Sequence, residues 1–294
     1  MQYDVIIVGG SYAGMAAALQ LARARRRIMV IDAGLRRNRF AEHSHGFLGR
    51  DGHAPGAIAE EAKGQLLAYP TVTWTEGKAG KAARTDNGFH IEMEAGESFD
   101  ARRLILALGV EDLLPDLPGL KERWGKSVFH CPYCHGYELN EGKIGVLAVG
   151  SISMHQALML PDWGSTTFFT NGTFSPDEEQ LAQLAARGVA VESTVVAGIT
   201  GHADVNLADG RTVSLAGLFT APATRPASPL AGQLGCALEE GPIGPYIRVN
   251  DTKETSVSGV FACGDAARAA GSVSLAVGDG AFAGAAAHRS LMFA

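Results

Sequence analysis

Residues 3–32 read YDVIIVGGSYAGMAAALQLARARRRIMVID and predict a single βαβ unit. Apolar runs at 3–8 and 28–31 predict two strands, and the Ala- and Leu-rich stretch 15–25 predicts a helix between them. Two strands joined by a helix within about 30 residues are parallel, and the connection is right-handed. The amino-terminal part of the chain is therefore expected to form an α/β fold around a parallel sheet.

The turn between the first strand and the helix, Gly9-Gly10-Ser11-Tyr12-Ala13-Gly14, approximates the pattern Gly-x-Gly-x-x-Gly, with Ser11 at the middle glycine position. Gly9 permits a tight turn, and Gly14 permits close packing of helix on strand. The start of the helix and the Ser11 hydroxyl offer hydrogen-bond donors to a pyrophosphate. Asp32 ends the second strand, where a carboxylate can bind ribose hydroxyls. The pattern predicts a dinucleotide site formed by Gly9, Gly10, Ser11, Ala13, Gly14 and Asp32; the alternative is a tight turn that binds nothing.

Composition limits the classes of protein to which the chain can belong. A length of 294 residues favours about two domains. The net charge of −6 gives no support to nucleic-acid binding. No apolar run reaches the roughly 20 residues that a membrane span needs. Four cysteines in so long a chain do not form a disulfide scaffold, so we expect a cytoplasmic protein in which a close cysteine pair serves redox or metal chemistry.

A second, weakly similar βαβ pattern lies further along the chain, with strands at 143–149 and 166–169 and a helix at 153–160. Nearer the carboxyl end, the apolar run 260–263 leads into Gly264-Asp265 and then a long helix from about residue 272. Asp265 is placed to bind a sugar-type hydroxyl such as that of a ribityl chain. The first turn of that helix, at Val273, would direct a positive dipole end towards a reduced flavin. A helix-capping role for Asp265 is the alternative.

The stretch His130-Cys131-Pro132-Tyr133-Cys134-His135 is the most informative in the chain. Cys131 and Cys134 lie on one face of a first helical turn and can close a small disulfide ring. Because Pro132 fits the first helical position, Cys131 is the expected cap, where the pKa of a thiol falls from about 8.5 towards 7. His130 and His135 are expected to titrate near neutrality and to move protons.

Zinc binding is the main alternative for this stretch, since Cys-x-x-Cys is half of a structural zinc site. The other two cysteines, Cys236 and Cys263, are far apart in the sequence, and the flanking histidines abut the pair. We therefore expect no metal, and we interpret Cys236 and Cys263 as small buried residues.

Together these elements resemble the low-molecular-weight thioredoxin reductase family of flavoproteins. The resemblance implies an α/β fold of two Rossmann-like three-layer domains, the second inserted into the first. It implies an FAD-binding domain at 1–114 and 245–294, an NAD(P)-binding-like domain at 115–244 that carries the cysteine pair, and a homodimer. It also implies that Cys134 faces the flavin and that Cys131 meets the substrate.

Two further parts of the chain belong to the cofactor site on this resemblance. Gly109 follows the central strand 104–108. His45 lies in the loop 34–56, which we expect to cover the flavin. The basic residues of that loop, Arg36, Arg37 and Arg39, could touch adenine or phosphate, but we interpret each of them as solvated.

The chain departs from the family at two places. His135 stands where thioredoxin reductases usually carry aspartate, and Cys-Pro-Tyr-Cys-His looks more like the flavin-dependent dithiol oxidases of the gliotoxin and holomycin type. In the second βαβ unit, Ala148 and Val149 stand where the family has glycines, and their side chains would obstruct a pyrophosphate. Residues 165–180 contain no Lys or Arg for a 2′-phosphate, so the sequence argues against NADPH and leaves NADH binding weak at most.

These observations predict an FAD-dependent enzyme that oxidises a dithiol, either a small molecule or a thioredoxin-like protein, with dioxygen as the acceptor. The rival hypothesis is an NAD(P)H- or ferredoxin-driven disulfide reductase with the same cysteines. A non-catalytic flavin-bound sensor is a third hypothesis.

Overall fold

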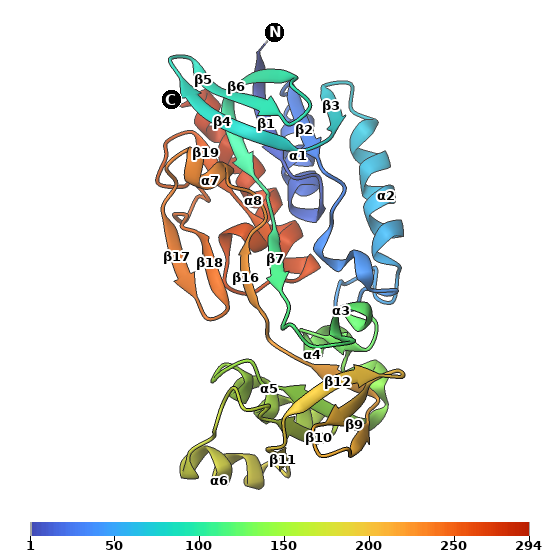
Figure 1. Cartoon of the computed structure of the whole chain (residues 1–294). Helices are drawn as coiled ribbons and strands as arrows, with labels where there is room; N and C mark the ends of the chain where they lie inside the picture. Colours follow the sequence, from blue (N-terminus) through green and yellow to red (C-terminus); the bar gives the residue numbers. More distant parts are fainter. Residues whose placement is uncertain (1, 294) are drawn as a thin grey trace.

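The computed structural model describes residues 2–293 as two α/β bodies joined by a narrow connection (Figure 1). The first body contains β1 (Tyr3–Val8), α1 (Tyr12–Arg23), β2 (Ile28–Asp32), η1 (Arg37–Phe40), α2 (Pro55–Leu67), β3 (Val72–Glu76), β4 (Ala79–Thr85), β5 (Gly88–Met93), β6 (Ser98–Leu106), α7 (Leu230–Gln233), β17 (Leu238–Gly241), β18 (Gly244–Ile247), β19 (Val260–Ala262), η4 (Gly264–Ala267) and α8 (Val273–Met292). The second contains α3 (Leu120–Arg123), β8 (Val128–Phe129), α4 (Pro132–His135), η2 (Tyr137–Leu139), β9 (Glu141–Leu147), α5 (Ser153–Met159), η3 (Leu160–Asp162), β10 (Gly164–Phe169), α6 (Glu178–Ala186), β11 (Ala190–Glu192), β12 (Val196–Thr200), β13 (Asp204–Leu207), β14 (Thr212–Ser214) and β15 (Gly217–Phe219). The strands β7 (Val110–Leu113) and β16 (Ala223–Pro226) run between the two bodies.

The sheet of the first body has the strand order β3-β2-β1-β6-β5-β4. β1 pairs in parallel with β2, with Val5 opposite Ile28, so the predicted βαβ unit is confirmed. The long strand β6 pairs in parallel with β1 and also with β19, which arrives from the far end of the sequence. Because parallel strands end at one edge of a sheet, the turns after β1, β6 and β19 lie together.

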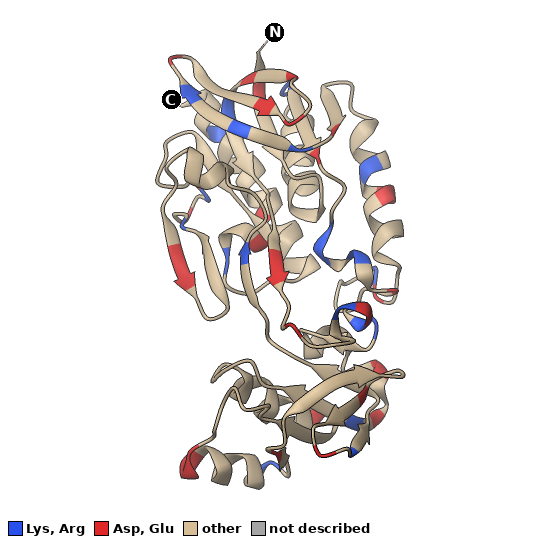
Figure 2. Ribbon diagram, in the orientation of Figure 1, with Lys and Arg blue, Asp and Glu red and all other residues tan. Residues whose placement is uncertain are grey.

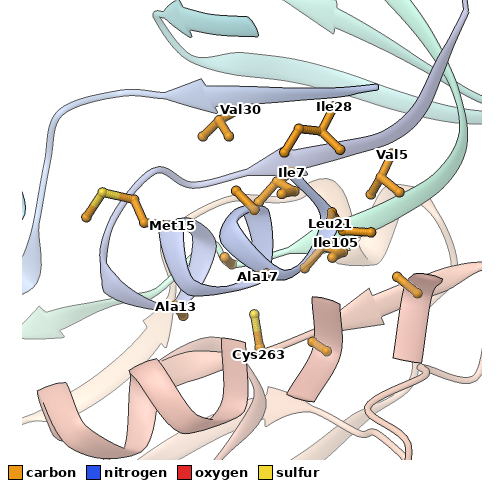
Figure 3. Close-up of a cluster of buried hydrophobic side chains, with 14 of the residues drawn as sticks. Val5, Ile7, Ala13, Met15, Ala17, Leu21, Ile28, Val30, Ile105 and Cys263 are labelled. Carbon is orange, nitrogen blue, oxygen red and sulfur yellow. The ribbon is translucent and has the colours of Figure 1, made fainter. Parts of the chain in front are cut away.

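Helices α1 and α8 pack against each other on one face of this sheet, over a core that includes Val5, Leu21 and Ile105 (Figure 3). A Cβ atom on Gly280 would collide with the carbonyl oxygen of Ala13, and one on Gly284 would collide with that of Ala17. The two helices therefore approach backbone to backbone. Cys263 is fully buried in this core, as predicted.

The second body has a five-stranded sheet in the order β11-β10-β9-β15-β8. β9 pairs in parallel with β10, with Ile144 opposite Thr166, and this confirms the second βαβ unit. Its own core is formed by large apolar side chains, among them Ile144, Phe168 and Phe219. An antiparallel sheet of β12, β13 and β14 completes the body.

The chain returns to the first body earlier than the predicted boundary at residue 245. Leu230, Ala231 and Cys236 are buried in the core of the first body, together with residues of β1 and β6. The predicted boundary falls within the β17–β18 hairpin, whose turn contains Pro242. We propose that the inserted unit ends near β16, because β16 pairs with β7 at the narrow connection. The burial of Cys236 agrees with its interpretation as a small core residue.

The close packing of α1 on α8 yields a stability prediction. Gly284→Val should lower the free energy of unfolding by about 1–3 kcal/mol, because the new side chain must displace the backbone of α1. Gly278→Ala is the matched control on α8, since a Cβ at Gly278 meets no atom within 4 Å. Thermal unfolding followed by circular dichroism measures both variants. Equal unfolding midpoints for the two would contradict the backbone-to-backbone packing.

Candidate dinucleotide and redox site

The turn after β1 is built around two glycines that no other residue can replace. Gly9 has φ +105°, and a Cβ atom there would collide with the carbonyl oxygen of Ala107. A Cβ atom on Gly14 would collide with the carbonyl oxygen of Gly9. The glycines therefore allow the turn and the close helix packing that the sequence predicts.

The start of α1 presents backbone donors. Ser11 caps the helix in an extended conformation, and its side chain makes no capping hydrogen bond. Within α1, the amide of Met15 donates to the Ser11 carbonyl at 2.9 Å. Within residues 2–293, the N–H groups of Tyr12 and Ala13 have no such acceptor, so they can bind an anion.

Asp32 lies at the end of β2 and beside this turn. Its Oδ1 accepts hydrogen bonds from the N–H of Gly10 at 3.2 Å and from that of Gly34 at 3.1 Å. Both bonds use one oxygen, which leaves Oδ2 for a ligand. The carboxylate is therefore held in place and can still bind a ribose hydroxyl.

The carboxyl-terminal elements complete the same edge of the sheet. Gly264 has φ +69°, and a Cβ atom on it would lie 2.8 Å from the Cβ of Ala13. The Gly264-Asp265 turn thus abuts the start of α1. Val273 begins α8, where the Ser272 side chain caps the helix by accepting from the N–H of Leu275 at 3.1 Å. Gly109, with φ +69°, follows β6 at this edge.

The cysteine pair begins the short helix α4, with Cys131 as its cap and Pro132 at the first helical position, as predicted. The Cys134 thiol donates to the Cys131 sulfur, and the two Sγ atoms are 2.6 Å apart. The two sulfurs are therefore close enough to form a disulfide with each other without movement of the backbone.

The acid–base properties of the two thiols differ. The pKa of Cys131 is lowered to about 7, first by the hydrogen bond from the Cys134 thiol and then by the backbone N–H groups of Cys134 and Tyr133. The same hydrogen bond, followed by burial, raises the pKa of Cys134. The expected lowering of the Cys131 pKa is thus present, and its largest cause is the neighbouring thiol rather than the backbone N–H groups of the helix. In the reduced pair, Cys131 carries the charge.

The expectation that the flanking histidines titrate near neutrality is wrong. Burial, followed by the charge of His45, lowers the pKa of His135 to about 4. Burial, followed by the charge of Arg37, also lowers the pKa of His130. His135 stacks on Phe129 with ring centroids 4.3 Å apart, and neither of its ring nitrogens has a hydrogen-bond partner within residues 2–293. The core around β8 excludes water from these rings, so both stay uncharged at pH 7.

The loop 34–56 belongs to the first body and also contacts the second. His45 Nδ1 lies 3.4 Å from a carboxylate oxygen of Glu138 in η2, next to the redox helix. Arg37 is not a solvated loop residue: its guanidinium pairs with Asp112 and Asp265. Sequence reasoning missed this position because both carboxylates are distant in the chain.

The turn after β9 differs from the turn after β1. The N–H of Val149 donates to Ser153 Oγ at 3.0 Å, and that of Ser153 donates to the Gly150 carbonyl at 3.1 Å. These donors are therefore occupied by the protein. Asn171, the residue considered for a ribose, accepts from the N–H of Val196 at 2.9 Å through its side-chain oxygen. Within residues 2–293, the amides of Ser151 and Ile152 have no protein acceptor, so this turn differs from the first in its side chains and not in its free donors.

Within residues 2–293, the structure contains no group of three or more His, Cys, Asp and Glu side chains arranged to hold a metal ion. The described part of the chain also has no helix with the length and apolar character required to cross a membrane.

Two Rossmann-type sheets with a vicinal cysteine pair between them define a disulfide oxidoreductase. The chain belongs to the pyridine nucleotide-disulphide oxidoreductase family, whose model matches residues 3–280. It is 34% identical to thioredoxin reductase tcpT of Claviceps purpurea, over 98% of this chain and 94% of that one. The crystal structure of an oxidoreductase from Agrobacterium tumefaciens is similar with TM-score 0.97 and 61% identity, over 100% of this chain and 99% of that one. The structure of HlmI is similar with TM-score 0.93 and 34% identity, over 99% and 93% of the two chains.

The unequal thiols yield a pH prediction. Alkylation of the reduced protein by iodoacetamide should have a midpoint near pH 7, with a rate that falls as pH drops and Cys131 becomes protonated. Cys134→Ala removes the donor thiol, so the midpoint should rise towards about 8.5. Cys131→Ser is the control and should lose the reactive thiol. A midpoint that Cys134→Ala leaves unchanged would show that another group activates Cys131.

Proposed function

We propose that the protein is an FAD-dependent thiol–disulfide oxidoreductase that oxidises a dithiol to a disulfide through Cys131 and Cys134, with dioxygen as the final acceptor. The observation that carries the proposal is the contrast between the two turns. The turn at Gly9 has glycine at its first two positions and a carboxylate, Asp32, with a free oxygen beside it. The turn after β9 has Ala148 and Val149 at those positions, and the side-chain oxygen of Asn171 already accepts from Val196. These differences support a nucleotide at the first turn and argue against a nicotinamide nucleotide at the second.

The residues of the first turn fit FAD. The collisions at Gly9 and Gly14 show a cradle that only glycine allows, and buried Asn38 Oδ1 beside it has no partner within residues 2–293. We propose that the α1 amides hold the pyrophosphate, that Asp32 holds the ribose, and that Asp265 holds the ribityl chain, with Gly109, His45 and Val273 around the ring. When bound, FAD supplies an acceptor for two electrons from a thiolate and a route for them to dioxygen.

The cysteine pair carries out the exchange with the substrate. A substrate thiolate attacks Cys131 of the disulfide form, which breaks the Cys131–Cys134 bond and forms a mixed disulfide. The second substrate thiolate attacks the substrate sulfur of that bond and releases Cys131. The substrate leaves as a disulfide, and its two electrons remain on the reduced pair. Because the pKa of Cys131 is about 7, Cys131 is a good leaving group in the second step.

The two histidines act without holding a charge. His130 and His135 are neutral at pH 7, and the ring nitrogens of His135 are buried, so these rings give the pair an uncharged surround and do not accept a proton. The proton of an incoming thiol passes to solvent. A pKa near 7 would have made the two histidines general bases, and their low pKa removes that role.

The rival function is a pyridine-nucleotide-driven reduction of a disulfide through the same pair. The family description and the names of relatives such as thioredoxin reductase tcpT favour it. It requires a nicotinamide nucleotide to bind at the turn after β9, where Ala148 and Val149 carry side chains in place of glycine.

We further propose that the enzyme is a cytoplasmic homodimer that binds no nucleic acid. Exposed apolar side chains on and after α8, namely Leu275, Phe282, Met292 and Phe293, suit a second copy of the chain. Basic and acidic residues are interspersed on both bodies, which argues against a nucleic-acid surface (Figure 2). The substrate is a dithiol that approaches beside Tyr133, which lies between the two cysteines and is 74% exposed.

Anaerobic absorption spectra distinguish the two directions of electron flow, from a dithiol to the flavin or from a nicotinamide nucleotide to a disulfide. Dithiothreitol should bleach the flavin of the holoenzyme within seconds, whereas NADPH should leave it oxidised, because the side chains of Ala148 and Val149 obstruct a pyrophosphate at the second turn. In air, the dithiol should yield one hydrogen peroxide per disulfide. Cys131→Ser should abolish both reactions while FAD stays bound, and Cys236→Ser is the control outside the pair. Rapid bleaching by NADPH would refute the oxidase direction.

A further inference from the structure

Arg37 occupies a place between three segments of the chain that are distant in the sequence. It begins η1, in the loop after β2. Its Nε and Nη2 donate to the two carboxylate oxygens of Asp112 at 3.1 and 2.5 Å. Its Nη1 donates to Asp265 Oδ2 at 2.9 Å. The guanidinium thus makes a two-point contact with one carboxylate and a single contact with another, a geometry that lysine cannot reproduce.

Asp112 belongs to the connection between the two bodies. It lies in β7, where it pairs with Thr224 of β16, and these two strands run from one body to the other (Figure 1). Its side chain is only 9% exposed. A carboxylate so little exposed is costly without a partner, so Arg37 determines how β7 lies against the first body.

Other contacts of the same loop reach the second body but are weaker. The backbone of Gly125 packs against Phe40, so closely that a Cβ on Gly125 would lie 2.7 Å from the Cβ of Phe40. The His45–Glu138 contact is looser at 3.4 Å, and the Glu138 side chain is 42% exposed. Arg37 is therefore the firmest ionic contact between this loop and the connection.

The charge of Arg37 also reaches the redox pair. The pKa of Cys131 is lowered first by the hydrogen bond from Cys134, and Arg37 adds to that lowering. Arg37 likewise opposes the rise in the pKa of Cys134, which comes first from its bond to Cys131. Both effects indicate that the guanidinium lies near the two sulfurs as well as at the connection formed by β7 and β16.

We propose that Arg37 is a positioning residue that holds β7 against the proposed flavin half of the molecule and so fixes the orientation in which Cys134 meets the flavin. This inference rests on the proposed function, because it assumes that electrons pass from the pair to FAD. Loss of the contact leaves β7 and β16 as a hinge. The pair then exchanges with substrate normally but reaches the flavin less often.

Arg37→Gln and Asp112→Asn test the inference in the holoenzyme. Anaerobic stopped-flow with excess dithiothreitol should show flavin reduction slowed between about tenfold and a hundredfold, the range expected for misplaced reacting groups. In Asp112→Asn, which leaves Arg37 and Asp265 in place, the FAD content and the first exchange of the dithiol with the pair should stay unchanged. The double variant should be no slower than the slower single variant, because both changes break one contact.

Arg225→Gln is the matched control. Arg225 pairs with Glu111 on the same two-stranded connection, at 2.8 Å, but the two side chains are 64% and 51% exposed. An exposed pair contributes little, so this variant should reduce its flavin at the wild-type rate. If Arg225→Gln slows flavin reduction as much as Arg37→Gln does, the specific role of Arg37 is refuted.

A second readout does not depend on activity. Hydrogen–deuterium exchange of segments 110–113 and 223–226 should be faster in Arg37→Gln and Asp112→Asn than in the wild type and Arg225→Gln. Unchanged exchange in both variants, or faster exchange with a wild-type rate of flavin reduction, overturns the inference. If Arg37→Gln does not fold, Asp112→Asn decides alone. A wild-type holoenzyme whose flavin dithiols do not reduce refutes the proposed function instead, and the exchange data still decide whether Arg37 holds β7.

Discussion

The parallel pairing of β6 with β1 on one side and β19 on the other is the constraint on which the rest of the structure depends. It brings the glycine-rich turn after β1 to the Gly264-Asp265 turn, although more than half of the chain separates them in sequence. The same strand continues through Gly109 into β7, which carries Asp112. One strand therefore aligns the dinucleotide cradle and also begins the connection to the redox pair.

The sequence predicted the features that depend on neighbouring residues. The βαβ unit, the place of Asp32 at the end of β2, and the cap at Cys131 follow from periodicity and turn chemistry, which are local. The predictions from sequence were wrong where contacts between distant segments determine a residue's burial or its partners. Burial beside Phe129 removes the neutral titration expected of His135, and the apolar residues near Leu230 join the first core rather than the inserted unit. The partners of Arg37 could not be read from the loop alone, because an isolated arginine in a basic loop gives no sign of the carboxylates that it will meet.

The two βαβ units show how one architecture can serve different chemistry. Both have a strand, a turn and a helix, and both sheets are parallel at this place. The first turn has glycines and a free carboxylate oxygen on Asp32, whereas the second has Ala148, Val149 and an Asn171 oxygen that Val196 occupies. A cysteine pair can pass electrons in either direction, so on the proposed function these side chains, rather than the thiols, distinguish the nucleotides that take part.

The contact between α1 and α8 has a consequence for how the chain folds during its synthesis. Ala13 and Ala17 leave the ribosome long before Gly280 and Gly284, because α1 and α8 are far apart in the chain. At about 5–20 residues per second, the early helix waits on the order of tens of seconds for the segment that covers it. During that interval its apolar face has no permanent cover, and chaperones have their opportunity to bind. The core between the two helices therefore closes late, well after α1 itself has been made.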